Sequence, residues 1–72
     1  MLELDLSGLD CPLPILKTKK FLSGVDSGIS VKIITTDPAS LIDLQDFCHK
    51  TGHILINQEQ IADKIYTIIQ HR

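Results

Sequence analysis

The chain of 72 residues is poor in features that several functional classes need. It has no tryptophan, only three other aromatic residues and two cysteines, and its net charge at pH 7 is −2. A protein that coats nucleic acid usually carries a basic face with stacking aromatic residues, so this composition counts against that class. No apolar run approaches the ~18 residues that indicate a membrane span. We therefore expect no direct contact with nucleic acid and none with a membrane.

The N-terminal residues and the low cysteine content bear on the compartment in which the protein is expected. Residues 1–5 are acidic and alternating, unlike the basic start of a signal peptide. Two cysteines cannot build the disulfide framework of a small secreted domain, and a permanent bridge from Cys11 to Cys48 is not expected in a reducing compartment. We expect a cytoplasmic protein with a single domain over residues 1–72.

The spacing of apolar residues predicts strands where they alternate and helices where they recur every three to four positions. The expected order is strand, helix, strand, helix, strand, strand, over residues 2–7, 12–23, 29–35, 37–52, 53–58 and 64–70. Asp37 is expected to cap the second helix, with Pro38 as its first residue and Gly52 as its stop. A loop is expected at residues 60–63.

This order of elements predicts an α+β fold. A strand–helix–strand unit favours a parallel pair with a right-handed crossover, and the last two strands are close enough to form a hairpin. Because each helix has one apolar face, we expect a two-layer α/β sandwich. It has βαβαββ order, with a four-stranded mixed sheet and two helices packed on one face.

Cys11 stands where the first strand gives way to the first helix, in Leu9-Asp10-Cys11-Pro12-Leu13-Pro14. Proline is favoured at the first helical position, so Pro12 places Cys11 at or near the N-cap, and Pro14 stiffens the first turn. The helix dipole there favours an anion, which predicts an exposed thiol with a lowered pKa. Lys17 is expected to bring its ammonium group close to the sulfur.

Other cysteine and histidine residues have simpler interpretations. A free cysteine is often buried, and Cys48 falls on the apolar face of the second helix, so we expect it to pack in the core. His49 and His53 lie near it, but the chain has no Cys-x-x-Cys pair and Gly52 separates the two histidines. We expect neither a metal site nor a cofactor. His53 is expected to help seat the strand after Gly52.

The run Gly8-Leu9-Asp10-Cys11-Pro12-Leu13-Pro14, followed by Lys17, resembles the signature of the TusA/SirA-like family of small sulfur carriers. Residues typical of that family also occur at Asp37-Pro38, Asp43, Phe47-Cys48 and Gly52-His53. The resemblance spans nearly the whole chain and implies a compact βαβαββ fold. It also implies that Cys11 carries sulfur as a persulfide, that Pro12 and Pro14 hold the loop, and that Lys17 stabilises an anion or docks a partner.

The resemblance also implies partners. In well-known members the sulfur comes from a cysteine desulfurase and passes to downstream relay proteins, ending in thiolation of a tRNA wobble uridine. Related members serve sulfur oxidation, molybdenum-cofactor assembly or selenium metabolism. On this basis we expect a monomeric carrier with a cysteine persulfide intermediate, rather than a turnover enzyme. Two alternatives stay open: a regulatory or protein-interaction module without sulfur chemistry, and an RNA-binding module, because similar small folds occur in a translation-factor domain.

Overall fold

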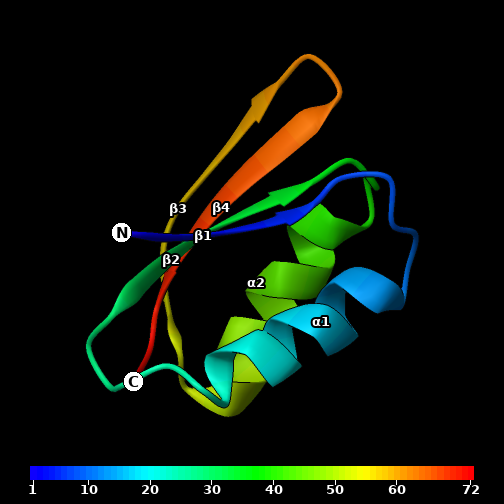
Figure 1. Ribbon diagram of the computed structural model, residues 1–72. Coiled ribbons are helices and arrows are strands. Elements are labelled where there is room, and N and C mark those ends of the chain that lie inside the picture. The colour runs from blue at the N-terminus through cyan, green and yellow to red at the C-terminus, as the bar shows by residue number, and fades with distance from the viewer.

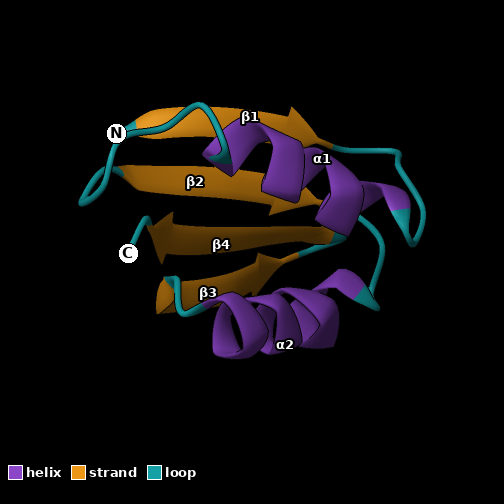
Figure 2. Ribbon diagram, turned by 90° about the horizontal axis from the view of Figure 1, so that it is seen from below, coloured by secondary structure: helices purple, strands orange, loops and turns teal.

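Four strands and two helices follow one another in the expected order (Figure 1). In this computed structural model, which describes residues 1–72, they are β1 (Leu2–Leu6), α1 (Leu13–Leu22), β2 (Ser30–Thr35), α2 (Ser40–Thr51), β3 (Ile54–Ile61) and β4 (Lys64–Gln70). The sheet order is β1-β2-β4-β3, with β1 parallel to β2 and the other neighbours antiparallel. Both helices lie on one face of this sheet (Figure 2). The predicted two-layer sandwich with a mixed sheet is therefore confirmed.

The core lies between the sheet and the two helices. Successive side chains of a strand point to opposite faces, so the alternating residues Val31 and Ile33 of β2 face the helices and are fully buried. The core cluster comprises Leu6, Leu22, Val31, Ile33, Leu44, Phe47, Cys48 and Ile69. The Thr18 side chain of α1 is also fully buried. No helix in the structure is long and apolar enough to cross a membrane.

Both helices begin later than the prolines predict. α1 starts at Leu13 and has Pro12 as its N-cap, in a non-helical conformation with φ −97° and ψ 11°. α2 starts at Ser40 and has Ala39 as its N-cap. The delay in α2 arises because the Asp37 carboxylate accepts a hydrogen bond from the Ala39 N–H at 3.0 Å, closing a turn before the helix. The prediction that Asp37 caps α2 is therefore wrong.

The third and fourth strands form a tighter hairpin than expected. β3 begins at Ile54 rather than His53 and continues to Ile61, and only Ala62 and Asp63 separate it from β4. Ala62 has a positive φ of 55°, which lets the chain reverse over two residues. The longer loop predicted at residues 60–63 is therefore wrong, whereas Gly52 is confirmed as the left-handed C-cap of α2, with φ 85°.

Candidate functional site

The thiol of Cys11 is exposed at the start of α1, as the sequence predicts. It opens onto a groove of about 430 Å³ between the two helices. The groove is lined by Cys11, Pro12, Ile15, Leu16 and Lys19 on one side and by Asp43, Asp46, Phe47, Lys50 and Thr51 on the other. Because Cys11 is exposed and lines this groove, its sulfur is available to a second macromolecule.

The loop that carries Cys11 is held by the segment that follows β2. The Cys11 N–H donates to the Asp37 carboxylate at 2.7 Å, and the Gly8 N–H donates to the Thr36 hydroxyl at 2.8 Å. Because β1 and β2 are parallel, the loops after them leave the same end of the sheet and run side by side (Figure 1). The hydrogen bonds from Cys11 and then Ala39 lower the pKa of Asp37. Asp37 therefore positions the site cysteine.

The charge around the sulfur is opposite to the one the sequence predicts. The pKa of Cys11 is raised, first by a hydrogen bond from its thiol to the Asp43 carboxylate, then by desolvation, and then by the negative charges of Asp43 and Asp37. The prediction of a lowered pKa is therefore wrong. Cys11 precedes the N-cap by one residue, so the helix terminus acts on it less directly than two nearby carboxylates do.

The prolines and lysines of the motif do not all line the groove at Cys11. Pro12 lines the groove, whereas Pro14 is buried in the first turn of α1. Lys17 lines a separate hollow with Leu4, Lys20 and Phe21, and it is Lys19 that lines the Cys11 groove. Side chains two positions apart in a helix point in directions that differ by about 200° around its axis, so Lys17 and Lys19 lie on different faces of α1. The structure therefore does not bring Lys17 into the groove.

Cys48 is a core residue, which confirms its predicted packing role. Only 4% of it is exposed, and desolvation raises the pKa of its thiol to about 11. Both cysteines are free thiols. Of the two, only Cys11 is accessible to an incoming sulfur.

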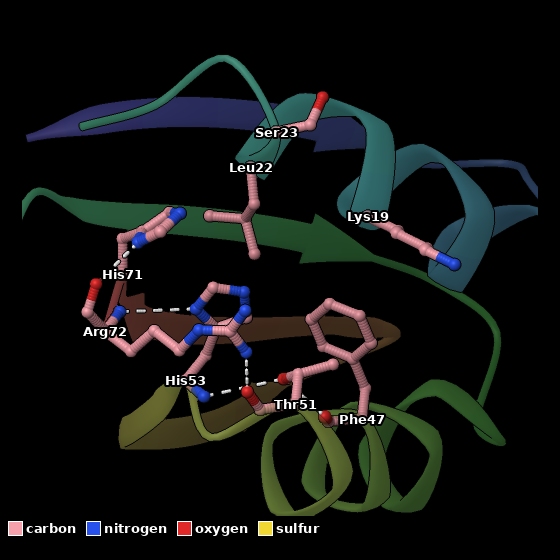
Figure 3. Close-up of a pocket in the computed structure, with 8 residues that line it drawn as sticks. All are labelled: Lys19, Leu22, Ser23, Phe47, Thr51, His53, His71 and Arg72. Atoms are coloured by element: carbon pink, nitrogen blue, oxygen red, sulfur yellow. Dashed lines mark hydrogen bonds between the residues drawn. The ribbon is translucent and has the colours of Figure 1, made fainter. Parts of the chain in front are cut away.

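A second hollow adjoins the Cys11 groove at the C-terminal ends of the helices (Figure 3). There His53 stacks on Phe47 with ring centroids 5.8 Å apart and meets the edge of His71 at 4.6 Å. The Arg72 N–H donates to Nδ1 of His53 at 3.3 Å, and the Arg72 guanidinium donates to the Thr51 carbonyl. Burial, followed by the charges of His71 and Arg72, lowers the pKa of His53. This cluster ties the end of β4 to the end of α2 through His53, the residue that precedes β3.

Sequence reasoning missed the part that the two carboxylates play at the site. The sequence predicts only a helix cap at Asp37, and it marks Asp43 only as a residue typical of the family. The parallel pairing of β1 and β2 was the available signal for Asp37, because it brings the loops that follow them together. The sequence holds no comparable signal for Asp43, which reaches Cys11 through the packing of α2 beside α1.

Comparison with known proteins gives consistent matches over almost the whole chain. The family model described as "Sulfurtransferase TusA" matches residues 2–70. The "Sulfur carrier protein TusA" of Allochromatium vinosum is 43% identical over 68 residues, which cover 94% of this chain and 90% of that protein. The protein of the same name from Pseudomonas putida is 36% identical over 59 residues, covering 82% of this chain and 74% of the relative.

A solved structure supports the same relationship. The crystal structure of a SirA-like protein from Desulfitobacterium hafniense superposes with a TM-score of 0.83 at 25% sequence identity and covers 97% of this chain and 96% of that one. The resemblance of the cysteine motif therefore extends to the whole sequence and to the fold. The chain belongs to the TusA family of sulfur carrier proteins.

Proposed function

We propose that the protein accepts a sulfane sulfur as a persulfide on Cys11 and passes it to an acceptor thiol of a partner protein. The observation that carries this proposal is the accessibility of one thiol: Cys11 is exposed and lines a groove, whereas Cys48 is buried in the core. A carrier needs one sulfur that other proteins can reach and no internal thiol that competes for the cargo. This arrangement meets both requirements.

The transfer needs no cofactor and changes no net oxidation state. The Cys11 thiolate attacks the outer sulfur of a donor persulfide, so a new S–S bond forms on Cys11 and the donor S–S bond breaks. The inner sulfur of the donor leaves as a thiolate and takes up the proton that Cys11 lost. In the second step an acceptor thiolate attacks the outer sulfur of the Cys11 persulfide, and Cys11 leaves as the thiolate.

The rigidity of the loop supports such a role. Pro12 and Pro14 restrict the backbone on one side of the cysteine, and the Asp37 carboxylate fixes the Cys11 N–H at 2.7 Å. Little ordering is then needed when a partner docks.

The donor is a cysteine desulfurase or another sulfur donor protein, and the acceptor is a downstream relay protein. Thiolation of a tRNA uridine, or another branch of sulfur metabolism, is the process served. Lys17, on another face of α1, docks a partner.

Loading by a desulfurase tests the proposal. The protein is incubated with a cysteine desulfurase and cysteine, and its intact mass is measured before and after reduction. We expect a gain of one sulfur that a thiol reductant removes, and no gain in Cys11→Ala. Equal labelling of Cys11→Ala and the natural chain contradicts the proposal. Absence of label, together with binding of a partner by Cys11→Ser, favours an interaction module without sulfur chemistry.

A further inference from the structure

We propose that two buried hydroxyl groups, those of Thr35 and Ser40, position the Cys11 sulfur for transfer. They do so by holding the segment 36–39, whose Asp37 carboxylate accepts the hydrogen bond from the Cys11 N–H. The inference rests on the proposed function, because it concerns how the reactive sulfur is held while it passes between proteins. It adds no bond change to that transfer, since both hydroxyls act through Asp37.

The two hydroxyls form a short chain of hydrogen bonds that ends on the backbone of Asp37. The Ser40 hydroxyl donates to the Asp37 carbonyl at 2.6 Å, and the hydroxyls of Thr35 and Ser40 bond to each other. Because a serine hydroxyl has one proton and a carbonyl can only accept, Thr35 is the donor to Ser40. The Ser40 N–H also donates to the Asp37 carbonyl, at 3.0 Å. Asp37 is thus held through its main chain, which leaves its carboxylate to accept the N–H groups of Cys11 and Ala39.

Burial makes these contacts selective for one position of the segment 36–39. Thr35 has no exposed surface, and Ser40 is 2% exposed. A buried hydroxyl without a partner has lost its hydrogen bonds to water, so a shift that parts the two side chains is costly. Thr35 ends β2 and Ser40 begins α2, so regular elements fix both residues. The hydroxyl chain therefore ties the segment between them to the core.

The contacts that reach the cysteine loop itself lie at the surface. The Cys11 N–H bonds to the Asp37 carboxylate there, and the Gly8 N–H bonds to the Thr36 hydroxyl. Exposed hydrogen bonds compete with water, so they fix the loop only where their acceptors are themselves held. Both acceptors directly follow Thr35 in the chain. The position of the sulfur thus depends on two interior side chains as well as on the site.

The consequence concerns the transfer step more than the docking of a partner. When a donor protein has docked, attack on its outer sulfur requires the Cys11 sulfur at a defined place, and a small displacement slows the reaction. Thr35 and Ser40 are buried, so they contribute nothing to the surface on which a partner docks. Loss of either hydroxyl should therefore lower the maximal rate of loading and leave the half-saturating donor concentration unchanged.

Replacement of one buried threonine tests the inference in the full chain. Thr35→Val removes the hydroxyl and keeps the shape of the side chain, whereas Thr35→Ser retains the hydroxyl. Ser40→Ala interrupts the same chain of bonds from the side of α2. The matched control is Thr67→Val, because Thr67 is also fully buried in a strand. Its hydroxyl accepts a hydrogen bond from Gln58 at 3.3 Å and has no bond to the segment 36–39.

Hydrogen exchange of the Cys11 amide, followed by NMR, reports how firmly the loop is held. We expect the exchange rate to rise ~3- to 10-fold in Thr35→Val and in Ser40→Ala. It should stay within ~2-fold of the natural rate in Thr35→Ser, and also in Thr67→Val, which reports any effect of a general loss of stability. An unchanged rate in Thr35→Val, or an equal rise in Thr67→Val, overturns the proposal.

Single-turnover loading from a persulfidated cysteine desulfurase, measured over a range of its concentrations, tests the transfer. We expect the maximal rate to fall ~3- to 10-fold in Thr35→Val and to recover in Thr35→Ser, with a half-saturating concentration within ~2-fold of the natural one. Loading of Thr35→Val at the natural maximal rate, or a change in the half-saturating concentration alone, overturns this inference and leaves the proposed function intact. Failure of the natural chain to load contradicts the proposed function.

Discussion

The Cys11 N–H donates a 2.7 Å hydrogen bond to the carboxylate of Asp37, a residue 26 positions further along the chain. The site cysteine is therefore anchored by a loop of the neighbouring strand as well as by its own helix. This contact depends on the parallel pairing of β1 and β2, which places the ends of both strands together. The fold thereby determines where the sulfur is presented.

Removing that anchor should loosen the loop. We expect Asp37→Ala to accelerate exchange of the Cys11 amide hydrogen by about tenfold, because an N–H without its acceptor opens more readily to water. Asp37→Asn retains one side-chain oxygen and should have a smaller effect. Hydrogen exchange followed by NMR measures the rate. An unchanged rate in Asp37→Ala means that the hydrogen bond does not hold the loop.

The anchor should also respond to acid. The pKa of Asp37 is lowered below its ordinary value of 3.8 in the folded chain, so the unfolded state takes up the proton first. The stabilisation is present above that value and is lost as the pH falls through the lower folded pKa. The Cys11 amide shift should therefore titrate with a midpoint below 3.8. A midpoint above this value contradicts the assignment.

The thiol itself should be a weak acid in the isolated protein. Since Asp43 and Asp37 oppose its ionisation, the rate of alkylation by iodoacetamide should rise with pH to a midpoint above the ordinary value of 9.0. Asp43→Asn should lower this midpoint and speed alkylation at neutral pH. The Cys11→Ser variant reports the background from Cys48. A midpoint at or below 9.0 in the natural chain is the contrary result.

The two cysteines should differ sharply in their tolerance of serine. Cys48 is 4% exposed within the core cluster, so Cys48→Ser buries a hydroxyl among apolar side chains. We expect it to lower the free energy of unfolding by ~1–3 kcal/mol, whereas the same change at exposed Cys11 stays within ~0.5 kcal/mol. Urea unfolding measures both. Similar values for the two variants contradict the assignment of Cys48 to the core.

The histidine cluster should make stability depend on pH near neutrality. The pKa of His53 is lowered by burial and by His71 and Arg72, so the unfolded chain binds the proton more readily. The free energy of unfolding should thus fall as the pH drops below 6.5 toward the folded pKa. His53→Phe should flatten this dependence of the free energy of unfolding on pH. The control His49→Gln, at an exposed position of α2, should leave the dependence unchanged. A slope that persists in His53→Phe contradicts the account.

Most of the fold could be predicted from hydrophobic spacing. Alternation in β2 and the apolar face of α2 identify elements because each must bury one side. The first residues of the helices were less predictable. Pro38 marks where a helix can begin, but the hydrogen bond from the Ala39 N–H to the Asp37 carboxylate closes a turn there, so α2 begins later. The length of the β3–β4 hairpin depends on the left-handed conformation of Ala62, for which alanine gives no signal.

The location of the site cysteine could be predicted from the sequence, whereas the charge that surrounds its sulfur could not. The motif alone indicates an exposed cysteine at the start of a helix, and Cys11 is found there. Its electrostatics depend on Asp43 and Asp37, which reach the sulfur only through packing of α2 and pairing of β2. The dipole of α1 favours a thiolate at Cys11, and the carboxylates of the neighbouring elements outweigh it.

Peptide-level mass spectrometry after loading shows whether Cys11 carries the sulfur. The protein is incubated with a cysteine desulfurase and isotopically labelled cysteine, its free thiols and persulfides are blocked, and it is digested. We expect one labelled sulfur on the peptide that contains Cys11 and none on the peptide that contains Cys48. Label on the Cys48 peptide, or on neither under conditions in which the desulfurase itself is persulfidated, contradicts it.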